Sequence, residues 1–204
     1  MQAKQPGILL NAAIESSLVR TVAETLESGT VALHAGGGAV DEDGYCYAHT
    51  VMSAAAADFI ANPGLQREHF GPVTLFVLCD SLDQMADTIN SLEGQLTATL
   101  QAEVDEIELT RPLAQALQKR VGRLIWNGVP TGVEVNYAMQ HGGPYPATTA
   151  AGSTSVGMTA IRRFMRPLAY QDLPGALLPA ALQDANPLGI LRLVNGEFTR
   201  EGIG

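Results

Sequence analysis

The sequence predicts an α/β fold in which a mostly parallel sheet is flanked by helices. Segments with helical spacing of apolar residues alternate with short runs of β-forming residues. The connections between these segments are short, as they are in βαβ units. With 204 residues and 46% hydrophobic composition, the chain can bury one sizeable core. We therefore expect one domain over residues 1–204.

The first predicted elements are a helix and a strand. Apolar residues recur every fourth position over 16–28, and Gly29 then offers a helix C-cap. Residues 30–34 read as a strand, which the run Gly36–Gly38 follows. The acidic stretch 39–44 is turn-like, so no helix stands behind these glycines to bind a phosphate. The run therefore indicates a turn.

The next elements are richer in β-formers. Residues 45–52 predict a strand, and Ser53 is expected to cap a short helix through Ala61. The continuous apolar run 73–79 is typical of a strand covered on both faces. Ser81 and Gln84 have the spacing of a capping box, which predicts a helix that ends before Gly94.

A further strand, helix and strand complete the α/β pattern. The strands are predicted at 96–101 and 123–126, and Pro112 begins or kinks the helix between them. The apolar face of this helix is expected to contain four residues at intervals of four: Leu109, Leu113, Leu117 and Val121.

The regular pattern ends at residue 127. The segment 127–155 is rich in glycine and proline, and long loops inside compact domains are usually functional or disordered. Its aromatic and apolar residues favour an ordered loop, because such side chains are normally buried. We expect a helix at 155–166, a proline- and leucine-rich stretch at 173–182 that completes the core, and a C-terminal strand at 190–194.

Composition argues against several kinds of partner. The net charge is -9, with 12 basic and 21 acidic residues, so we expect no binding to nucleic acid or to anionic lipid. No apolar run reaches the ~18 residues of a membrane span, and the first residues lack the apolar core of a signal peptide. The chain has only two cysteines, Cys46 and Cys79, and this low number indicates a reducing, cytoplasmic setting. Both are expected to be buried, inert thiols.

The histidines are the remaining candidates for chemistry. His34, His49, His69 and His141 have neither HExxH spacing nor neighbouring cysteine pairs, so we expect no metal site. His141 lies beside glycines in the long loop, where an imidazole could transfer protons near neutral pH. The alternative is that it only anchors the loop through a hydrogen bond.

One segment points to a family. Residues 67–73, REHFGPV, resemble the ExFGP segment of the aldehyde dehydrogenase superfamily. In that family the glutamate holds the hydroxyls of the nicotinamide ribose and the phenylalanine packs beside the nicotinamide ring. The resemblance assigns these cofactor-binding roles to Glu68 and Phe70, and a carboxylate and an aromatic face suit them. His69 stands where the family usually has an aliphatic residue, and Arg67 replaces a frequent acid.

The resemblance continues in order along the chain, through residues 80–83, 94–98 and 122–127. The segment 123–149 is most similar to the NADP-preferring branch that contains 2,5-dioxovalerate (α-ketoglutarate semialdehyde) and long-chain fatty aldehyde dehydrogenases. His141 belongs to that branch pattern, in a loop that runs past the active site.

The resemblance implies the C-terminal portion of an aldehyde dehydrogenase catalytic domain. Such an enzyme oxidises an aldehyde to a carboxylate with NADP or NAD: a cysteine thiolate attacks the aldehyde, hydride leaves for the cofactor, and a glutamate base assists hydrolysis. No segment here resembles the nucleophile loop, the base or the N-terminal cofactor-binding domain. We therefore expect a partial cofactor site and no activity from the chain alone. Its expected partners are the missing N-terminal portion, the aldehyde and further copies of itself.

The alternative is a non-catalytic oligomerisation or binding module with the same fold. The strand expected at 190–194 favours this alternative, since an unpaired strand edge can bind another chain. In either case, a sheet without its neighbouring domain would expose apolar surface, so we expect dimerisation or aggregation.

Overall fold

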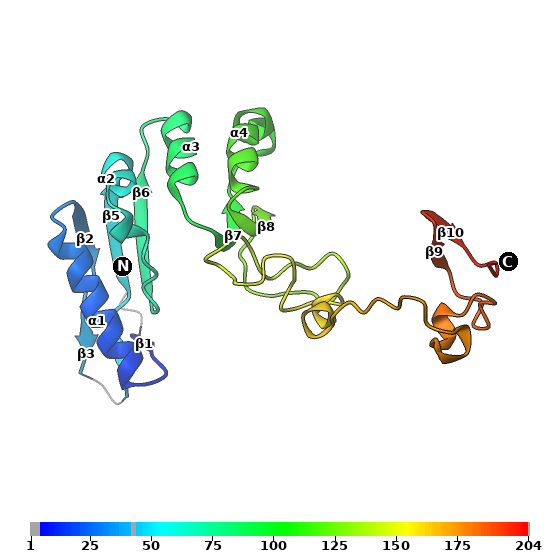
Figure 1. The fold of residues 1–204 in the computed structure, drawn as a ribbon. Coiled ribbons are helices and arrows are strands. Elements are labelled where there is room, and N and C mark those ends of the chain that lie inside the picture. Colours follow the sequence, from blue (N-terminus) through cyan, green and yellow to red (C-terminus); the bar gives the residue numbers. More distant parts are fainter. Residues whose placement is uncertain (1–4, 42–43, 204) are drawn as a thin grey trace. The chain divides into compact units, whose positions relative to one another are not determined.

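The computed structural model describes residues 5–41 and 44–203. The chain divides into two compact units, Met1–Arg163 and Phe164–Gly204. The first unit contains helices and strands in the alternation that the sequence predicts, which confirms the α/β class (Figure 1). The parallel pairing occurs in two separate sheets of this unit.

The first of these sheets has the order β2-β5-β6, formed by Val31–Ala35, Thr50–Ala55 and Val73–Leu78. Strand β2 runs antiparallel to β5, whereas β5 and β6 are parallel and start together, with Thr50 opposite Val73. Helix α1, Ala12–Glu27, contributes Leu18 and Val22 to a buried cluster with Tyr47 and Met52. This cluster fixes α1 against the sheet.

Shorter elements border the first sheet. Strands β1 (Gly7–Ile8), β3 (Ala39–Val40) and β4 (Cys46–Tyr47) form a small antiparallel sheet. Helix α2 spans Ala56–Ala61, and the short 3-10 turn η1 spans Pro63–Gln66.

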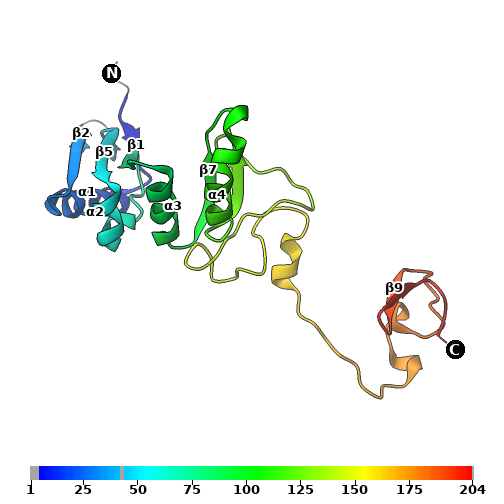
Figure 2. The same cartoon turned by 90° about the horizontal axis from the view of Figure 1, so that it is seen from above.

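The second parallel sheet consists of β7 (Gln95–Leu100) and β8 (Val121–Trp126). Helices α3 (Leu82–Ser91) and α4 (Ile107–Leu117) pack together beside it around Ile89 and Leu113. Figure 2 shows α4 alongside this pair of strands. Pro112 lies inside α4, which the 3-10 turn η2 (Val104–Glu106) precedes.

Several sequence expectations are confirmed. Ser81 caps α3, because its side chain accepts a hydrogen bond from the amide of Gln84 at 3.1 Å. Gly29 follows α1 with φ of 75°, the conformation of a glycine that ends a helix. Helix α1 itself begins earlier than expected, because the side chain of Asn11 caps it at Ile14.

Other expectations for the first unit are wrong. The strand expected at 45–52 is two strands of different sheets, interrupted where the amide of Ala48 donates to the carbonyl of Gly38. Ser53 lies within β5 and caps nothing, since α2 begins at Ala56 with no side-chain cap. Strand β6 is covered on one face only, with Phe76 54% exposed.

Helix α4 and the end of the first unit also differ from expectation. Leu109 is 57% exposed, so it does not share the buried face of Leu113 and Leu117, and Val121 already belongs to β8. No helix or strand lies between Trp126 and Ala160. Only the 3-10 turn η3, Ala160–Phe164, forms where a helix was expected, because Thr154 and Ser155 are bonded to the loop at His141 and Gly157 has φ of 102°.

The second unit is built around a hairpin. The strand expected at 190–194 is β9 (Arg192–Val194), which pairs with β10 (Glu197–Thr199) through the turn Asn195–Gly196. Both turn residues have positive φ, as a two-residue hairpin requires. The stretch 173–182 forms two 3-10 turns, η4 (Gly175–Leu177) and η5 (Ala180–Leu182). It belongs to this unit and not to the first core.

Candidate functional site

The residues between η1 and β6, 67–72, form a turn that we call the site loop. Within it, the amide of Gly71 donates to the carbonyl of His69 at 2.7 Å, which closes a tight three-residue turn around Phe70. Phe70 is 66% exposed, and Glu68 is also exposed. The two residues that the sequence assigns to cofactor binding are therefore accessible on one short turn.

The alternate residues of the site loop contact helix α1. The ring of His69 hydrogen bonds the hydroxyl of Thr21 through Nδ1 at 3.3 Å and the hydroxyl of Thr25 through Nε2 at 3.2 Å. Both threonines are buried, and their spacing of four places them on the same face of the helix. Arg67 makes a further contact to α1, an ion pair with Glu24 at 2.5 Å.

Gly71 brings the site loop closest to α1. A Cβ at this position would lie 2.3 Å from Cδ2 of Leu18, which is only 2% exposed. A side chain at position 71 would therefore collide with the core. His69, Arg67 and Gly71 together hold the loop on α1, while Glu68 and Phe70 stay accessible.

The site loop lies at the edge of the sheet where β5 and β6 begin. The amide of Thr50 donates to the carbonyl of Pro72 at 2.8 Å, and the hydroxyl of Thr50 accepts from the amide of Gly37 at 2.8 Å. The glycine run is thus a neighbour of the site loop. Gly36 and Gly37 have φ of 72° and 97°, and the run forms an irregular connection between β2 and β3.

The charges around His69 favour its neutral form. Burial lowers the pKa of His69, and the positive charge of Arg67 lowers it further. The hydrogen bond from Arg20, together with the one from Arg67, lowers the pKa of Glu24. At neutral pH the ring therefore carries one N–H and one acceptor nitrogen, and a threonine hydroxyl can complement either.

His141 lies in a different part of the first unit. The loop around it packs against the start of β7 and β8, since a Cβ on Gly122 would lie 2.1 Å from the carbonyl of Gly142. Its backbone anchors the loop: the amide donates to Thr154 Oγ1 at 2.8 Å, and the carbonyl accepts from Ser155. Its ring Nδ1 is enclosed without a hydrogen-bond partner in the described structure. The anchoring bonds therefore come from the backbone, and the Nδ1 atom of the ring is not used for them.

Neither cysteine has the surroundings of an exposed nucleophile. Cys46 is buried in β4, and Cys79 is half-buried with Sγ 3.7 Å from the hydroxyl of Thr88. Within residues 5–41 and 44–203, no group of three or more histidine, cysteine or acidic residues could hold a metal ion. No helix in the same ranges is long and apolar enough to cross a membrane.

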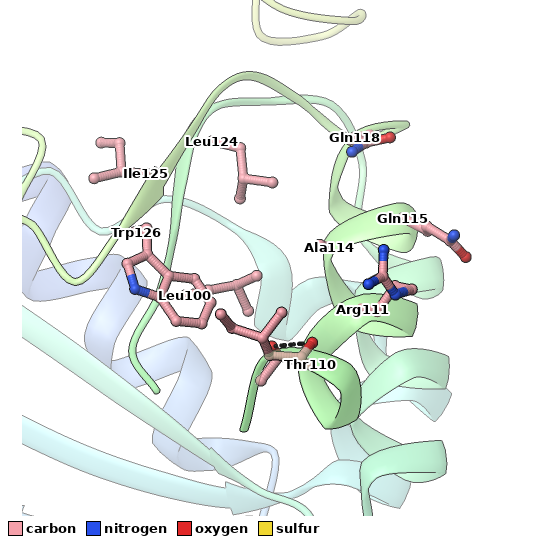
Figure 3. A pocket seen from close by; sticks show the side chains of 10 residues that line it. Leu100, Thr110, Arg111, Ala114, Gln115, Gln118, Leu124, Ile125 and Trp126 are labelled. Carbon is pink, nitrogen blue, oxygen red and sulfur yellow. Dashed lines mark hydrogen bonds between the residues drawn. The ribbon is translucent and has the colours of Figure 1, made fainter. Parts of the chain in front are cut away.

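Two hollows border the described elements of the first unit. One, of about 480 Å³, lies between α4 and β8, with Trp126 and Leu100 on the strand side and Arg111 on the helix side (Figure 3). The other, of about 620 Å³, is lined in part by Arg67 and Gln66 and so adjoins the site loop. Neither encloses Glu68 or Phe70.

Sequence reasoning missed the threonine partners of His69. The available signal was the pair Thr21 and Thr25, two hydroxyl residues on the same helix face as the apolar Leu18 and Val22. Such a face predicts burial, and buried hydroxyls need hydrogen-bond partners.

Comparison with known proteins gives a consistent family. The sequence pattern of the "Aldehyde dehydrogenase family" matches residues 2–165. The chain is 52% identical over 147 residues to alpha-ketoglutaric semialdehyde dehydrogenase 2 of Azospirillum brasilense, covering 72% of this chain and 28% of that protein. It is 38% identical over 195 residues to alpha-ketoglutaric semialdehyde dehydrogenase of Acinetobacter baylyi, and the match covers 96% of this chain and 37% of that protein. The chain thus spans well under half the length of these relatives.

Solved structures show the same fold. The NAD+ complex of aldehyde dehydrogenase from Bacillus cereus is similar with a TM-score of 0.60 at 21% identity, over 76% of this chain and 28% of that one. Betaine aldehyde dehydrogenase from Staphylococcus aureus is similar with a TM-score of 0.61 at 15% identity, over 77% and 29%. At these identities the likeness concerns the fold alone.

Proposed function

The chain belongs to the aldehyde dehydrogenase family, and on that premise we propose that it forms the nicotinamide-binding side of an enzyme that oxidises an aldehyde to a carboxylate with NAD(P)+. The observation that carries the proposal is the exposure of Glu68 and Phe70 on a turn whose other residues are fixed on α1. Glu68 would accept hydrogen bonds from the ribose hydroxyls, and Phe70 would restrain the nicotinamide ring so that one face receives the hydride.

The substrate in this proposal is a semialdehyde such as 2,5-dioxovalerate. Two curated relatives, at 52% and 38% identity, carry the name alpha-ketoglutaric semialdehyde dehydrogenase, which favours a semialdehyde over a fatty aldehyde. The family branch that residues 123–149 resemble prefers NADP+, so NADP+ is the proposed cofactor in place of NAD+. We also propose a cytoplasmic location, because a chain of 204 residues with only two cysteines has the composition of a protein from a reducing compartment.

His141 has a proposed role on the substrate side. Its backbone already anchors the long loop, which leaves the enclosed Nδ1 without a partner in the described structure. A buried imidazole nitrogen normally has a hydrogen-bond partner, so an acceptor or donor brought by the assembled enzyme or by substrate would satisfy it. The ring could then bind substrate or transfer a proton.

The nucleophilic thiolate in this proposal comes from outside the chain. Cys46 is buried among core residues, and Cys79 faces Thr88 and the carbonyl of Val77. A catalytic thiol must reach the aldehyde and ionise readily, which an electropositive and accessible setting permits. We therefore propose that the active enzyme combines this chain with a portion that carries the cysteine, the base and the dinucleotide-binding domain, and that it is a homo-oligomer.

A graft tests the proposal. The full chain replaces the matching stretch of the Acinetobacter baylyi relative, which aligns with 195 residues of it. The grafted enzyme is expected to reduce NADP+ with α-ketoglutaric semialdehyde, whereas the chain alone is expected to form neither reduced cofactor nor a thioester. A folded graft that is inactive with both NADP+ and NAD+, or activity from the chain alone, would contradict the proposal.

A non-catalytic oligomerisation module is the second candidate. Leu193 and Phe198 are opposite each other on the β9–β10 hairpin and are 63% and 73% exposed. An exposed apolar pair on a two-stranded sheet favours contact with another chain. Under this candidate the chain self-associates but the graft is inactive; light scattering that shows only monomer at high concentration would exclude it.

A further inference from the structure

The imidazole of His69 makes two directional contacts where an apolar side chain would suffice for packing. Its two nitrogens reach different hydroxyls, Thr21 at 3.3 Å and Thr25 at 3.2 Å, on one face of α1. Two hydrogen bonds from opposite sides of a planar ring define both its position and its tilt. A leucine of similar size would fill the same space but would make neither hydrogen bond to α1.

The contacts also provide hydrogen-bond partners for two buried hydroxyls of α1. Thr21 and Thr25 are 8% and 6% exposed, and a buried hydroxyl that loses its partner carries the cost of its lost hydration. The hydroxyl of Thr21 has a second partner in the carbonyl of Leu18 at 3.2 Å. Thr25 therefore depends more strongly on the ring of His69 than Thr21 does.

Because His69 is directly bonded to Glu68 and Phe70 along the chain, fixing its ring on α1 also fixes the backbone of these two exposed residues. His69 lies between Glu68 and Phe70, and its carbonyl closes the turn around Phe70. The other polar contact of the loop to α1, between Arg67 and Glu24, joins side chains that are 54% and 44% exposed. Ion pairs of such exposure contribute little, so the part-buried His69 contacts contribute more to the placement of the loop than the ion pair does.

We propose that His69 is a positioning residue for cofactor binding: its ring is bonded to both Thr21 and Thr25, and this fixes the turn that presents Glu68 and Phe70. The inference rests on the proposed function of these two residues. Small displacements of a positioned group cost much in binding and in hydride transfer, since an error of about 1 Å can lower a rate roughly a hundredfold.

The first arm of the test uses the full chain and needs no cofactor. Amide hydrogen exchange is measured at Gly71, Val73 and Thr50, whose amides donate to carbonyls of the site loop. His69→Leu is expected to speed exchange at these three amides about tenfold, the size expected from the loss of one or two hydrogen bonds. Exchange at Ile89, in the other core cluster, is expected to stay unchanged.

Matched variants separate the bond from the side chain. Thr25→Val removes the hydroxyl and keeps the shape, so it is expected to reproduce the effect, and the double variant with His69→Leu is expected to add little to it. His69→Gln can still donate and accept, so it is expected to restore most of the protection. His34→Leu is the control, because it breaks a comparable histidine bond to Ser53 at 2.7 Å between β2 and β5.

The second arm uses the grafted enzyme. His69→Leu is expected to raise the KM for NADP+ about tenfold with a smaller change in kcat, and His69→Gln is expected to restore it. Unchanged exchange at the site loop, or an unchanged KM in His69→Leu while Glu68→Gln raises it, would overturn the inference and leave the proposed function standing. An unchanged KM in Glu68→Gln would instead refute the proposed function, and the exchange arm would still decide whether His69 fixes the loop.

Discussion

The substitution Gly71→Ala tests directly how the site loop packs on α1. The new Cβ would lie 2.3 Å from Cδ2 of Leu18 and 3.3 Å from its Cδ1 and Cγ atoms. Leu18 is 2% exposed and packs in the core cluster of Val22, Tyr47 and Met52, so it has little room to move. The collision therefore has to shift either the core or the loop.

The magnitude follows from two opposing effects. Forcing an extra methyl group into a packed core costs about 1–3 kcal/mol. Replacing glycine by alanine also restricts the unfolded chain, which stabilises the folded state by about 0.4–1 kcal/mol where the backbone conformation permits. Gly38 offers the matched control, because a Cβ there meets no atom of the described residues within 4 Å. Gly38→Ala is therefore expected to show the stabilising effect alone.

Thermal and urea unfolding of the two variants measure the difference. For a chain of this size 1 kcal/mol corresponds to about 2–4 °C in Tm, so Gly71→Ala is expected to melt about 2–12 °C below Gly38→Ala. Adding Leu18→Val removes the colliding methyl carbon and is expected to recover part of the loss, although the valine alone destabilises. Equal melting temperatures for the two alanine variants would refute the packing of the site loop on α1.

Further expectations concern other parts of the chain. Ser81→Ala removes the N-cap of α3 and is expected to cost about 1 kcal/mol in urea unfolding; no loss would mean that the cap is replaced. Leu113→Ala is expected to cost about 2–5 kcal/mol, because Leu113 is 3% exposed in its cluster, and a loss below 1 kcal/mol would contradict that burial. Asn186→Ala is expected to unfold the second unit selectively, visible as collapsed NMR dispersion for residues 186–201, because this side chain bonds three backbone groups; retained dispersion would count against it. Burial and Arg67 lower the folded pKa of His69, so its contribution to the free energy of unfolding is complete above the unfolded value of about 6.5 and is lost as the pH falls toward the folded pKa. His69→Leu is expected to flatten that acidic slope, and an identical slope in both proteins would contradict the assignment.

The sequence predicted the elements whose signals are local. Helix α3 begins at its cap because the hydroxyl of Ser81 reaches an amide three residues away. Glu68 and Phe70 were proposed as site residues from a short motif, and the structure shows both side chains exposed on one turn.

Other features depend on contacts between distant residues. The expected strand at 45–52 divides because Ala48 bonds Gly38, ten residues earlier in the chain. The expected helix at 155–166 is lost where Ser155 and Thr154 bond His141 in the preceding loop. Local helix and strand propensities do not depend on partners that are distant in the sequence, so they could not predict the divided strand or the lost helix.

The partners of His69 could not be predicted for the same reason. Thr25 and Thr21 precede His69 by 44 and 48 residues, and only the packing of α1 on the sheet brings them together. The sequence could show that His69 stands where the family usually has an aliphatic residue, but only the fold shows which side chains it bonds.

Cofactor kinetics of the grafted enzyme test the central claim most directly. Glu68→Gln removes the carboxylate that would accept hydrogen bonds from the ribose hydroxyls. It is expected to raise the KM for NADP+ about 10- to 100-fold, because charge-assisted hydrogen bonds are lost. Phe70→Ala is expected to raise it as well, and Phe70→Tyr, which keeps the ring, is expected to restore it. Glu27→Gln is the control: it changes an exposed carboxylate on α1, outside the site loop, and is expected to leave the KM for NADP+ unchanged. If Glu68→Gln and Phe70→Ala bound NADP+ as tightly as the unsubstituted graft, the site loop would not be the nicotinamide site.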